Sequence, residues 1–179
     1  MPGNEAPPAY ITTDRLAIRP PGPGDAAAIH RGLNDFGVVS MLSRAPWPYR
    51  LVDAEAFIGR LPGRDPAKER PLSIIHREHG LIGGTGFHAD EEEPFAELGF
   101  WLARPHWGQG YATEAVTAVL DWARHAWGKR AVRAGHFVEN ERSGRVLTKV
   151  GMLYTGVVER LHCEARGEAL PARKLIWLA

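Results

Sequence analysis

Gly108-Gln109-Gly110 lies between a strand-like pattern and the start of a helical pattern. Glycine permits a tight turn at such a place and lets another molecule approach the backbone closely. The first N–H groups of a helix have no partner within the helix, and the helix dipole is positive at that end. These features predict a loop that binds an anion such as a diphosphate.

The elements on either side of this loop follow from periodicity. The residues from Glu97 to Leu102 alternate, with aromatic side chains suited to a pleated surface, so they predict a strand that Pro105 ends. From Tyr111 the pattern becomes helical, and Gly128 is placed to end the helix. The expected apolar stripe of this helix consists of Ala112, Ala115, Val116, Val119, Ala123, Ala126 and Trp127.

A nicotinamide dinucleotide site is one interpretation of a glycine loop in this position. That site requires G-x-G-x-x-G and a carboxylate about 20 residues further on. Here Thr113 stands at the third glycine position, and residues 129–133 read KRAVR, without a carboxylate. A dehydrogenase is therefore the least favoured class of enzyme.

The same segment resembles a known family. Residues 107–115, WGQGYATEA, preceded by ELGFWL at 97–102, resemble the acetyl-CoA-binding motif of GNAT N-acetyltransferases. Within that superfamily they are similar to the RimJ/RimL-type branch, which acetylates ribosomal-protein N-termini and other amines. The superfamily pattern Gln/Arg-x-x-Gly-x-Gly/Ala falls on Trp107, Gly110 and Ala112, so Trp107 departs from it. The first expected strand, TDRLAIRP at 13–20, resembles the branch's T-x-R-L-x-L-R.

The resemblance covers about residues 12–178 and implies an α/β (α+β) GNAT fold. This fold is a central mixed, mostly antiparallel sheet flanked by helices. A splayed parallel strand pair, on either side of the central helix, binds acetyl-CoA, and a bulge in the 97–102 strand is expected to splay it. We expect one domain over residues 10–179 after a flexible N-terminus at 1–9.

Acetyl-CoA is the implied cosubstrate, without a metal. The strand at 97–102 would exchange backbone hydrogen bonds with the pantetheine arm, and the glycine loop would bind the diphosphate. The expected cofactor-binding residues are Phe100, Trp101, Leu102, Trp107, Gly108, Gln109, Gly110, Tyr111, Ala112, Thr113 and Asn140. Asn140 is equally suited to be a plain helix N-cap.

Acetyl transfer to an amine requires a neutral nucleophile and a proton for the leaving thiolate. Glu97 shares a strand face with Gly99 and Trp101. The branch implies that this glutamate activates the amine, directly or through water; the alternative is a carboxylate anchored to a backbone group or an arginine. An α-amino group, with a pKa of about 7.7–8.0, needs less base than a lysine-like amine near 10.4.

Two residues compete to protonate the thiolate. Residues 140–143, NERS, resemble the N-x-x-S of the branch at the next helix start, which makes Ser143 one candidate. Ser143 as a first-turn capping residue is the alternative. Tyr154 is the rival acid, because many other GNAT enzymes place a tyrosine just after this helix.

Local signals predict the remaining elements. Asp25 is expected to cap a helix at 26–33, and Asp53 a short helix that follows it. Strands are expected at 72–76, 81–88, 131–138, 152–161 and 170–178, and a helix from Asn140 that Gly151 stops. Trp47 and Tyr49 line the acceptor mouth or belong to the core.

Several polar residues have a functional and a structural interpretation. The Asp90 to Glu93 run is either a solvated loop or a surface that attracts a cationic acceptor. His88, His106 and His136 lack metal-ligand spacing and read as strand or surface residues. Cys163 is the single cysteine, so an internal disulfide is excluded, and it is expected to be inert.

Composition narrows the class of protein. The chain has 179 residues, 22 Lys plus Arg against 21 Asp plus Glu, and 44% hydrophobic residues. This balance gives no excess of positive charge that would attract nucleic acid or a membrane surface. No apolar run reaches about 18 residues and no signal peptide is evident, so we expect a cytoplasmic protein, monomeric or homodimeric.

The sequence therefore predicts an acetyl-CoA-dependent N-acetyltransferase acting on a primary amine. The acceptor would be a protein N-terminus or a small amine, and it would attack directly in a ternary complex. Two alternatives stay open. One is a small-molecule acetyltransferase for an antibiotic, polyamine or amino acid, and the other is an acyl-CoA-binding module without turnover.

Overall fold

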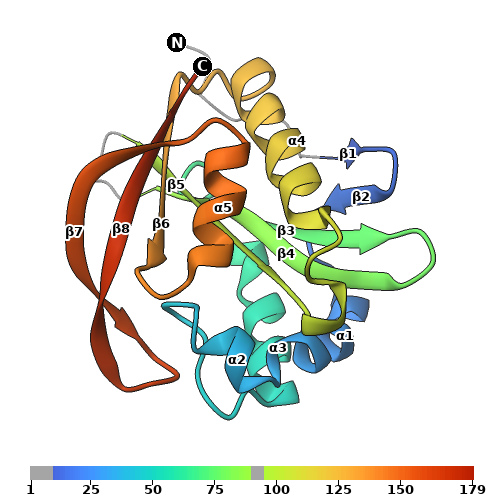
Figure 1. Cartoon of the computed structure of the whole chain (residues 1–179). Helices are drawn as coiled ribbons and strands as arrows, with labels where there is room; N and C mark the ends of the chain where they lie inside the picture. The colour runs from blue at the N-terminus through green and yellow to red at the C-terminus, as the bar shows by residue number, and fades with distance from the viewer. Residues whose placement is uncertain (1–9, 90–94) are drawn as a thin grey trace.

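One mixed sheet organises the computed structural model, which describes residues 10–89 and 95–179 (Figure 1). The expected flexible N-terminus at 1–9 and the Asp90 to Glu93 run lie outside the described residues. Within the described part, eight strands lie in the order β1-β2-β3-β4-β5-β6-β8-β7. They are β1 (Ile11–Thr12), β2 (Leu16–Arg19), β3 (Glu69–His76), β4 (Gly80–His88), β5 (Ala96–Leu102), β6 (Ala131–Phe137), β7 (Leu153–Cys163) and β8 (Glu168–Leu178).

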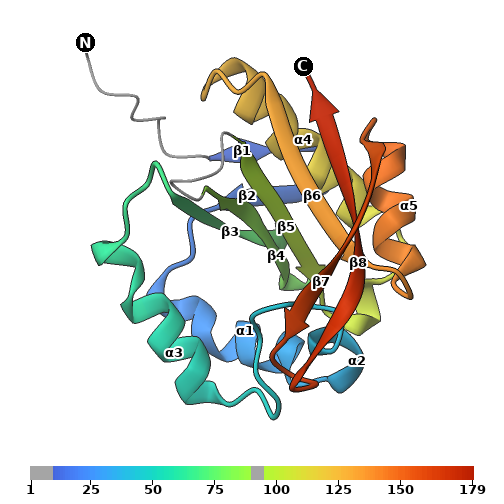
Figure 2. The same ribbon diagram turned by 90° about the vertical axis from the view of Figure 1, so that its left-hand side faces the viewer.

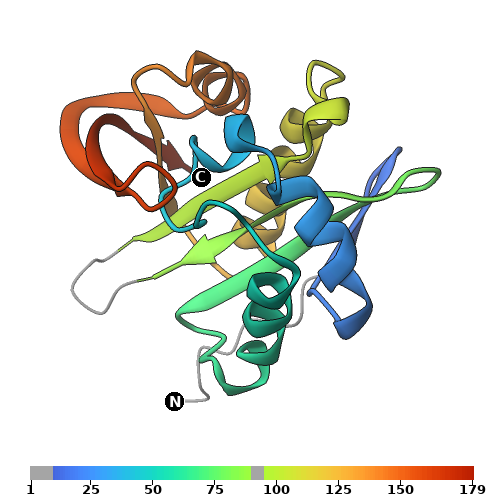
Figure 3. The ribbon, with the colours of Figure 1, turned by 90° about the horizontal axis from the view of Figure 1, so that it is seen from below.

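Helices cover both faces of this sheet. Helices α1 (Ala26–Leu33), α2 (Phe36–Val39) and α3 (Leu51–Gly59) lie on the face toward the viewer in Figure 3. Helices α4 (Tyr111–His125) and α5 (Glu141–Lys149) cover the opposite face (Figure 1). Short 3-10 turns are η1 (Pro23–Asp25), η2 (Leu61–Gly63) and η3 (Arg104–His106). None of the described helices is long and apolar enough to span a membrane.

The apolar stripe of α4 forms the main core. Ala115, Val116, Val119 and Ala123 of this helix are fully buried. They pack with inward-facing residues of the sheet such as Leu98. The predicted helix is confirmed, and so is the order of strand, glycine loop and helix.

Asp25 is the N-cap residue of α1, as predicted, but its carboxylate makes no capping hydrogen bond; the cap predicted at Asp53 is wrong, because Arg50 is the N-cap of α3. The Asp25 carboxylate does not cap α1; it accepts two hydrogen bonds from Arg19, at 2.7 and 2.9 Å, and one from Ser73 at 3.2 Å. Asp53 is the third residue of α3 and accepts from the Arg50 N–H at 2.8 Å, because this helix begins at Leu51. Partners from other elements decide what the Asp25 carboxylate does, whereas the Asp53 carboxylate bonds with Arg50, the N-cap of its own helix.

The Asp25 network joins β2 to β3 and carries a stability prediction. Burial by itself raises the pKa of Asp25, but hydrogen bonds from Arg19 and the Gly22 N–H outweigh burial and hold this pKa below 3.8. A depressed pKa stabilises the fold above the unfolded value, and this contribution is lost as pH falls through the folded pKa.

Asp25→Asn should therefore lower the free energy of unfolding by about 2–3 kcal/mol at pH 7, because it leaves a charged partner with weaker bonds. Urea titrations should show this difference shrinking as pH falls below about 4. Asp53→Asn, which changes the exposed pair with Arg50, should cost less. Equal losses in both variants would contradict the assignment.

Candidate active site

Strands β5 and β6 part after three paired positions. Ala96 to Leu98 pair in parallel with Val132 to Ala134, and no later residues of the two strands are paired. Beyond this point β5 stays on β4 as far as Leu102, and β6 stays on β8 as far as Phe137. The predicted splayed pair is confirmed. The bulge expected in β5 is wrong, because its register with β4 is continuous from Glu97 to Leu102.

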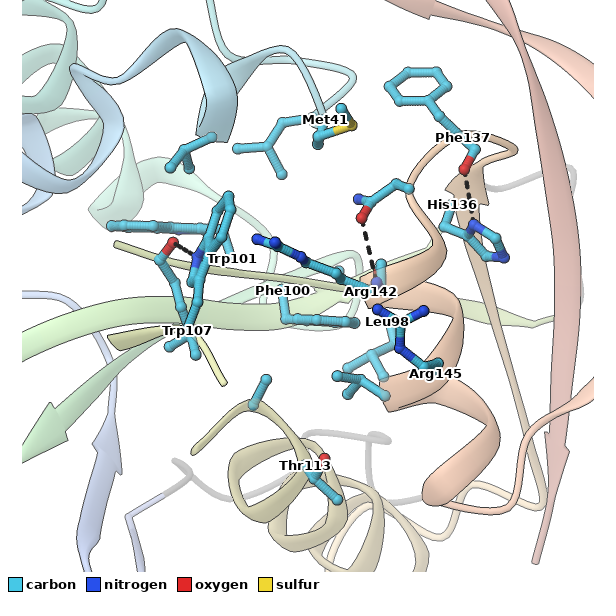
Figure 4. A pocket seen from close by; sticks show the side chains of 18 of the residues that line it. Met41, Leu98, Phe100, Trp101, Trp107, Thr113, His136, Phe137, Arg142 and Arg145 are labelled. Atoms are coloured by element: carbon cyan, nitrogen blue, oxygen red, sulfur yellow. Dashed lines mark hydrogen bonds between the residues drawn. The ribbon is translucent and has the colours of Figure 1, made fainter. Parts of the chain in front are cut away.

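A pocket of about 560 Å³ opens where these strands part. It runs from Thr113, at the start of α4, to Met41 and Phe137 at the other end (Figure 4). The predicted site residues that line it are Glu97, Phe100, Trp101, Leu102, Trp107, Gly108, Gly110, Tyr111, Ala112, Thr113, Asn140 and Ser143. Gln109 and Tyr154, which were also predicted, are not among the lining residues.

The glycine loop forms one end of the pocket. Gly108 and Gly110 have φ of +76° and +82°, in the left-handed region that favours glycine, and Gly110 is the N-cap of α4. Arg15 holds the loop, since its Nη1 donates to the Gln109 carbonyl at 3.0 Å and its Nε donates to Glu114 at 2.7 Å. The loop is thus fixed from the first strands of the sheet.

Glu114, in the first turn of α4, completes this clamp. The Thr13 hydroxyl donates to its carboxylate at 2.6 Å, and the Arg15 N–H donates to the same oxygen at 3.0 Å. Burial works to raise the pKa of Glu114, but these hydrogen bonds outweigh burial and lower it. The Arg15 guanidinium, paired with Glu114, offsets the negative charge of this carboxylate next to the loop.

Trp107 explains the departure from the family pattern at its position. Its indole N–H donates to the Leu102 carbonyl at 2.7 Å, which ties the loop to the end of β5. The guanidinium groups of Arg104 and Arg142 each lie 5.1 Å from its ring. Trp107 therefore fixes the loop through its large aromatic ring, and the two arginines lie close enough to this ring for cation–π contacts.

Helix α5 brings cations to the pocket that the sequence interpretation missed. Arg142, Arg145 and Lys149 line it (Figure 4 labels the two arginines). Their spacing of three and four residues places them on one face of the helix. That spacing is readable in the sequence, although a charged helix face is commonly just solvated.

Glu97 lies on a different wall and has a cationic partner. Lys174 of β8 donates to its carboxylate at 3.2 Å and to Glu159 of β7 at 2.9 Å. Burial acts to lower the pKa of Lys174, but the hydrogen bond to Glu159 and the charge of Glu97 outweigh it and raise this pKa. Lys174 therefore stays charged at neutral pH. Sequence reasoning did not find it.

The start of α5 presents Ser143 and Asn140 to the pocket. The Asn140 side-chain oxygen accepts from the Ser143 N–H at 3.2 Å, so the N-cap role of Asn140 is confirmed. Tyr154 lies behind this helix, and its hydroxyl is 2.9 Å from His136 Nε2. His136 Nδ1 is 2.8 Å from the Phe137 carbonyl. A carbonyl only accepts, so Nδ1 carries the proton, and in the neutral ring Nε2 accepts from Tyr154.

The far end of the pocket is formed by the segment after α2 and by the β7–β8 hairpin. The two meet where the Glu164 N–H donates to the Ser43 carbonyl at 3.0 Å, as the proximity of α2 and the hairpin in Figure 2 indicates. Cys163 is fully buried there. Trp47 and Tyr49 are not part of the lining; Tyr49 packs in the core of α1 to α3.

Two of the three histidines considered from the sequence line the pocket. His106 lines the pocket, and burial lowers its pKa. His136 lines it too, although the sequence suggested only a strand residue. His88 lies 3.4 Å from Glu69. Within residues 10–89 and 95–179, no three His, Cys, Asp or Glu residues are grouped so that they could hold a metal ion.

A family model described as "Acetyltransferase (GNAT) domain" matches residues 15–153. The uncharacterized N-acetyltransferase YnaD of Bacillus subtilis (strain 168) is 31% identical over 152 residues, which cover 84% of this chain and 86% of YnaD.

Three solved structures share the fold. A GNAT-family acetyltransferase from Bacillus anthracis superposes with a TM-score of 0.82 at 23% identity, covering 95% of this chain and 98% of that one. Mycobacterium smegmatis RimJ in complex with CoA-disulfide gives 0.80 at 20%, covering 97% and 87%. Spermidine N-acetyltransferase from Vibrio cholerae, in complex with CoA and spermine, gives 0.77 at 20%, covering 93% and 96%.

The glycine loop can be tested with coenzyme A, which the last two structures contain. Gly110→Ala forces a side chain into a left-handed conformation at a cost of about 1–2 kcal/mol, and the loop can relieve it by turning its N–H groups away. We expect coenzyme A to bind about tenfold more weakly by calorimetric titration.

Gly128→Ala is the matched control. Gly128 follows the other end of α4 with φ +67°, so it carries the same backbone strain away from the pocket. It should lose similar thermal stability and keep parental affinity. Equal affinities in the two variants would refute the assignment of the loop as the diphosphate site.

Proposed function

The chain belongs to the GNAT family of acetyltransferases, and from this premise we propose that it transfers the acetyl group of acetyl-CoA to a primary amine by direct attack in a ternary complex. The GNAT fold and the likeness to RimJ-type proteins, both predicted from the sequence, are confirmed. One observation carries the proposal. The unpaired edge of β5, the glycine loop and Glu97 all line a single pocket.

The residues present fit coenzyme A. The Gly108–Gly110 loop offers backbone N–H groups at the positive end of α4 to a diphosphate. Arg145 and Lys149 add positive charge on the facing helix. From Gly99 to Leu102, β5 has no strand on its β6 side. The Leu102 carbonyl accepts from Trp107, and the other backbone groups on this side are available to the amides of pantetheine. This fit supports acetyl-CoA as the cosubstrate.

The reaction requires one bond to form and one to break. The amine nitrogen attacks the thioester carbonyl carbon, the carbon–sulfur bond breaks, the amine loses a proton and the thiolate gains one. Holding both substrates in one pocket supplies much of the rate, because correct orientation alone removes about 7–11 kcal/mol of barrier. The proposed role of Glu97 is to take the proton of the amine, directly or through water.

Ser143 is the residue that we propose protonates the thiolate. It lines the pocket at the start of α5, whereas Tyr154 does not belong to the lining. The Tyr154 hydroxyl is already engaged by His136 at 2.9 Å. This placement supports Ser143 over its rival.

The activity is tested by measuring the thiol released from acetyl-CoA with a panel of peptides that have free N-termini, polyamines, aminoglycosides and amino acids. Acceptor-dependent release supports transfer. Binding of coenzyme A with no release for any amine would instead support a binding module without turnover.

Glu97→Gln should lower kcat by about 10²–10⁴-fold at pH 7, the range of general base catalysis. The loss should shrink at high pH, where more of the acceptor amine is already neutral. Glu159→Gln is the comparison, since it removes the other carboxylate on Lys174 from outside the pocket and leaves Glu97 in place; it should lower kcat far less than Glu97→Gln. A Glu97 variant that keeps more than about a third of parental kcat, far from the 10²-fold loss, would exclude the base role.

Ser143→Ala should lower kcat by an amount near the lower end of the 10²–10⁴-fold range, with little change in the KM of acetyl-CoA. The reason is that thiolate protonation matters only as the bond breaks. Tyr154→Phe, measured beside it, should have the smaller effect. The reverse order would transfer the acid role to Tyr154.

A further inference from the structure

The end of the pocket away from the glycine loop has apolar walls. Val38, Met41 and Leu42 come from α2 and the segment that follows it, and Leu161 comes from β7. Trp101 lies on the β5 face that is turned toward α1 to α3. Met41 and Phe137 mark this end in Figure 4, opposite Thr113. An acceptor bound here meets mostly hydrocarbon.

The charges of the pocket are unevenly divided. Glu97 is the one carboxylate among the lining residues of the described part of the chain, and Lys174 already pairs with it. The lining cations Arg142, Arg145 and Lys149 all belong to α5. Arg145 and Lys149 are the two cations assigned to the cosubstrate, which leaves Arg142. A molecule with several ammonium groups would therefore find one carboxylate, which is already paired, and a cation nearby.

We propose that the acceptor is a primary monoamine with an apolar substituent, and that polyamines and aminoglycosides are poor acceptors. The inference rests on the proposed acetyl transfer and names its substrate class. The single ammonium of the acceptor pairs with Glu97 before it loses its proton. The substituent lies against Met41, Leu42 and Leu161, where each buried methylene contributes about fourfold in affinity.

A second ammonium has no such place. It would leave water for an apolar wall without a counter-ion, and an unpaired charge pays most of its lost hydration. In the other direction it would approach Arg142 of α5. Both positions are unfavourable, so a diamine gains nothing from its second charge.

Two amines of equal size test the proposal. n-Heptylamine and 1,6-diaminohexane have the same chain of heavy atoms, with a methyl group in one replaced by an ammonium in the other. Thiol release from acetyl-CoA should give a kcat/KM at least about tenfold higher for n-heptylamine, because the apolar wall accepts a methyl group and not a charge. An equal or higher value for the diamine would overturn the proposal.

Leu161→Glu should reverse this preference, since it adds a carboxylate to the apolar wall. Leu161→Gln has the same size without the charge and should lower the n-heptylamine value without favouring the diamine. Val157→Glu is the matched control, because Val157 is exposed on the same strand and outside the lining. It should keep the parental ratio.

The outcomes separate this inference from the proposed function. If Leu161→Glu retains the parental ratio, Leu161 does not contact the acceptor and the assigned wall is wrong. Thermal unfolding shows whether each variant folds. If Leu161→Glu does not fold, the ratio of the two kcat/KM values measured with the parent protein decides the proposal. Should no amine be acetylated while coenzyme A binds, the proposed function fails. Efficient acetylation of the diamine would contradict the proposed substrate class and leave the proposed acetyl transfer intact.

Discussion

The site depends on backbone amide groups of β5 that have no strand to pair with on one side. From Gly99 to Leu102, the β4 side of this strand is paired and the β6 side is open. Strand β6 does not close the gap, because its pairing with β8 continues to Phe137. Buried N–H and C=O groups require partners, so the open edge favours an extended molecule that carries amides of its own. Two intact ladders thus hold open the gap between them.

The glycine loop, the proposed diphosphate site, is placed at this gap by contacts that are distant along the chain. Arg15 reaches from before β2 to the Gln109 carbonyl and to Glu114, and Trp107 ties the loop to Leu102. The buried stripe of α4 fixes the helix whose N-terminus the loop forms. Preorganised N–H groups cost little to align when an anion binds, so the rigidity of this corner serves binding directly.

Local patterns in the sequence predicted the elements and the loop, whereas partners from other elements decided the rest. The alternation at 97–102 and the helical period from Tyr111 are properties of neighbouring residues, and both predictions are confirmed. Asp25 satisfied the rule for an N-cap, yet Arg19 and Ser73 took its carboxylate. Lys174 lies 77 residues from Glu97, and no local signal joins them. The apolar wall at Met41 and Leu161 likewise comes from two distant segments.

The pair of carboxylates on Lys174 gives Glu97 freedom that a single ion pair would not. A half-buried lysine that lost its only partner would be left as an uncompensated charge, which is costly. Here Glu159 holds Lys174 at 2.9 Å, closer than Glu97 does at 3.2 Å. In the proposed reaction, Glu97 turns to the ammonium of the acceptor while Lys174 keeps Glu159 as its counter-ion. Glu97 then exchanges Lys174 for the acceptor. Lys174, whose raised pKa keeps it charged, stays paired with Glu159 throughout.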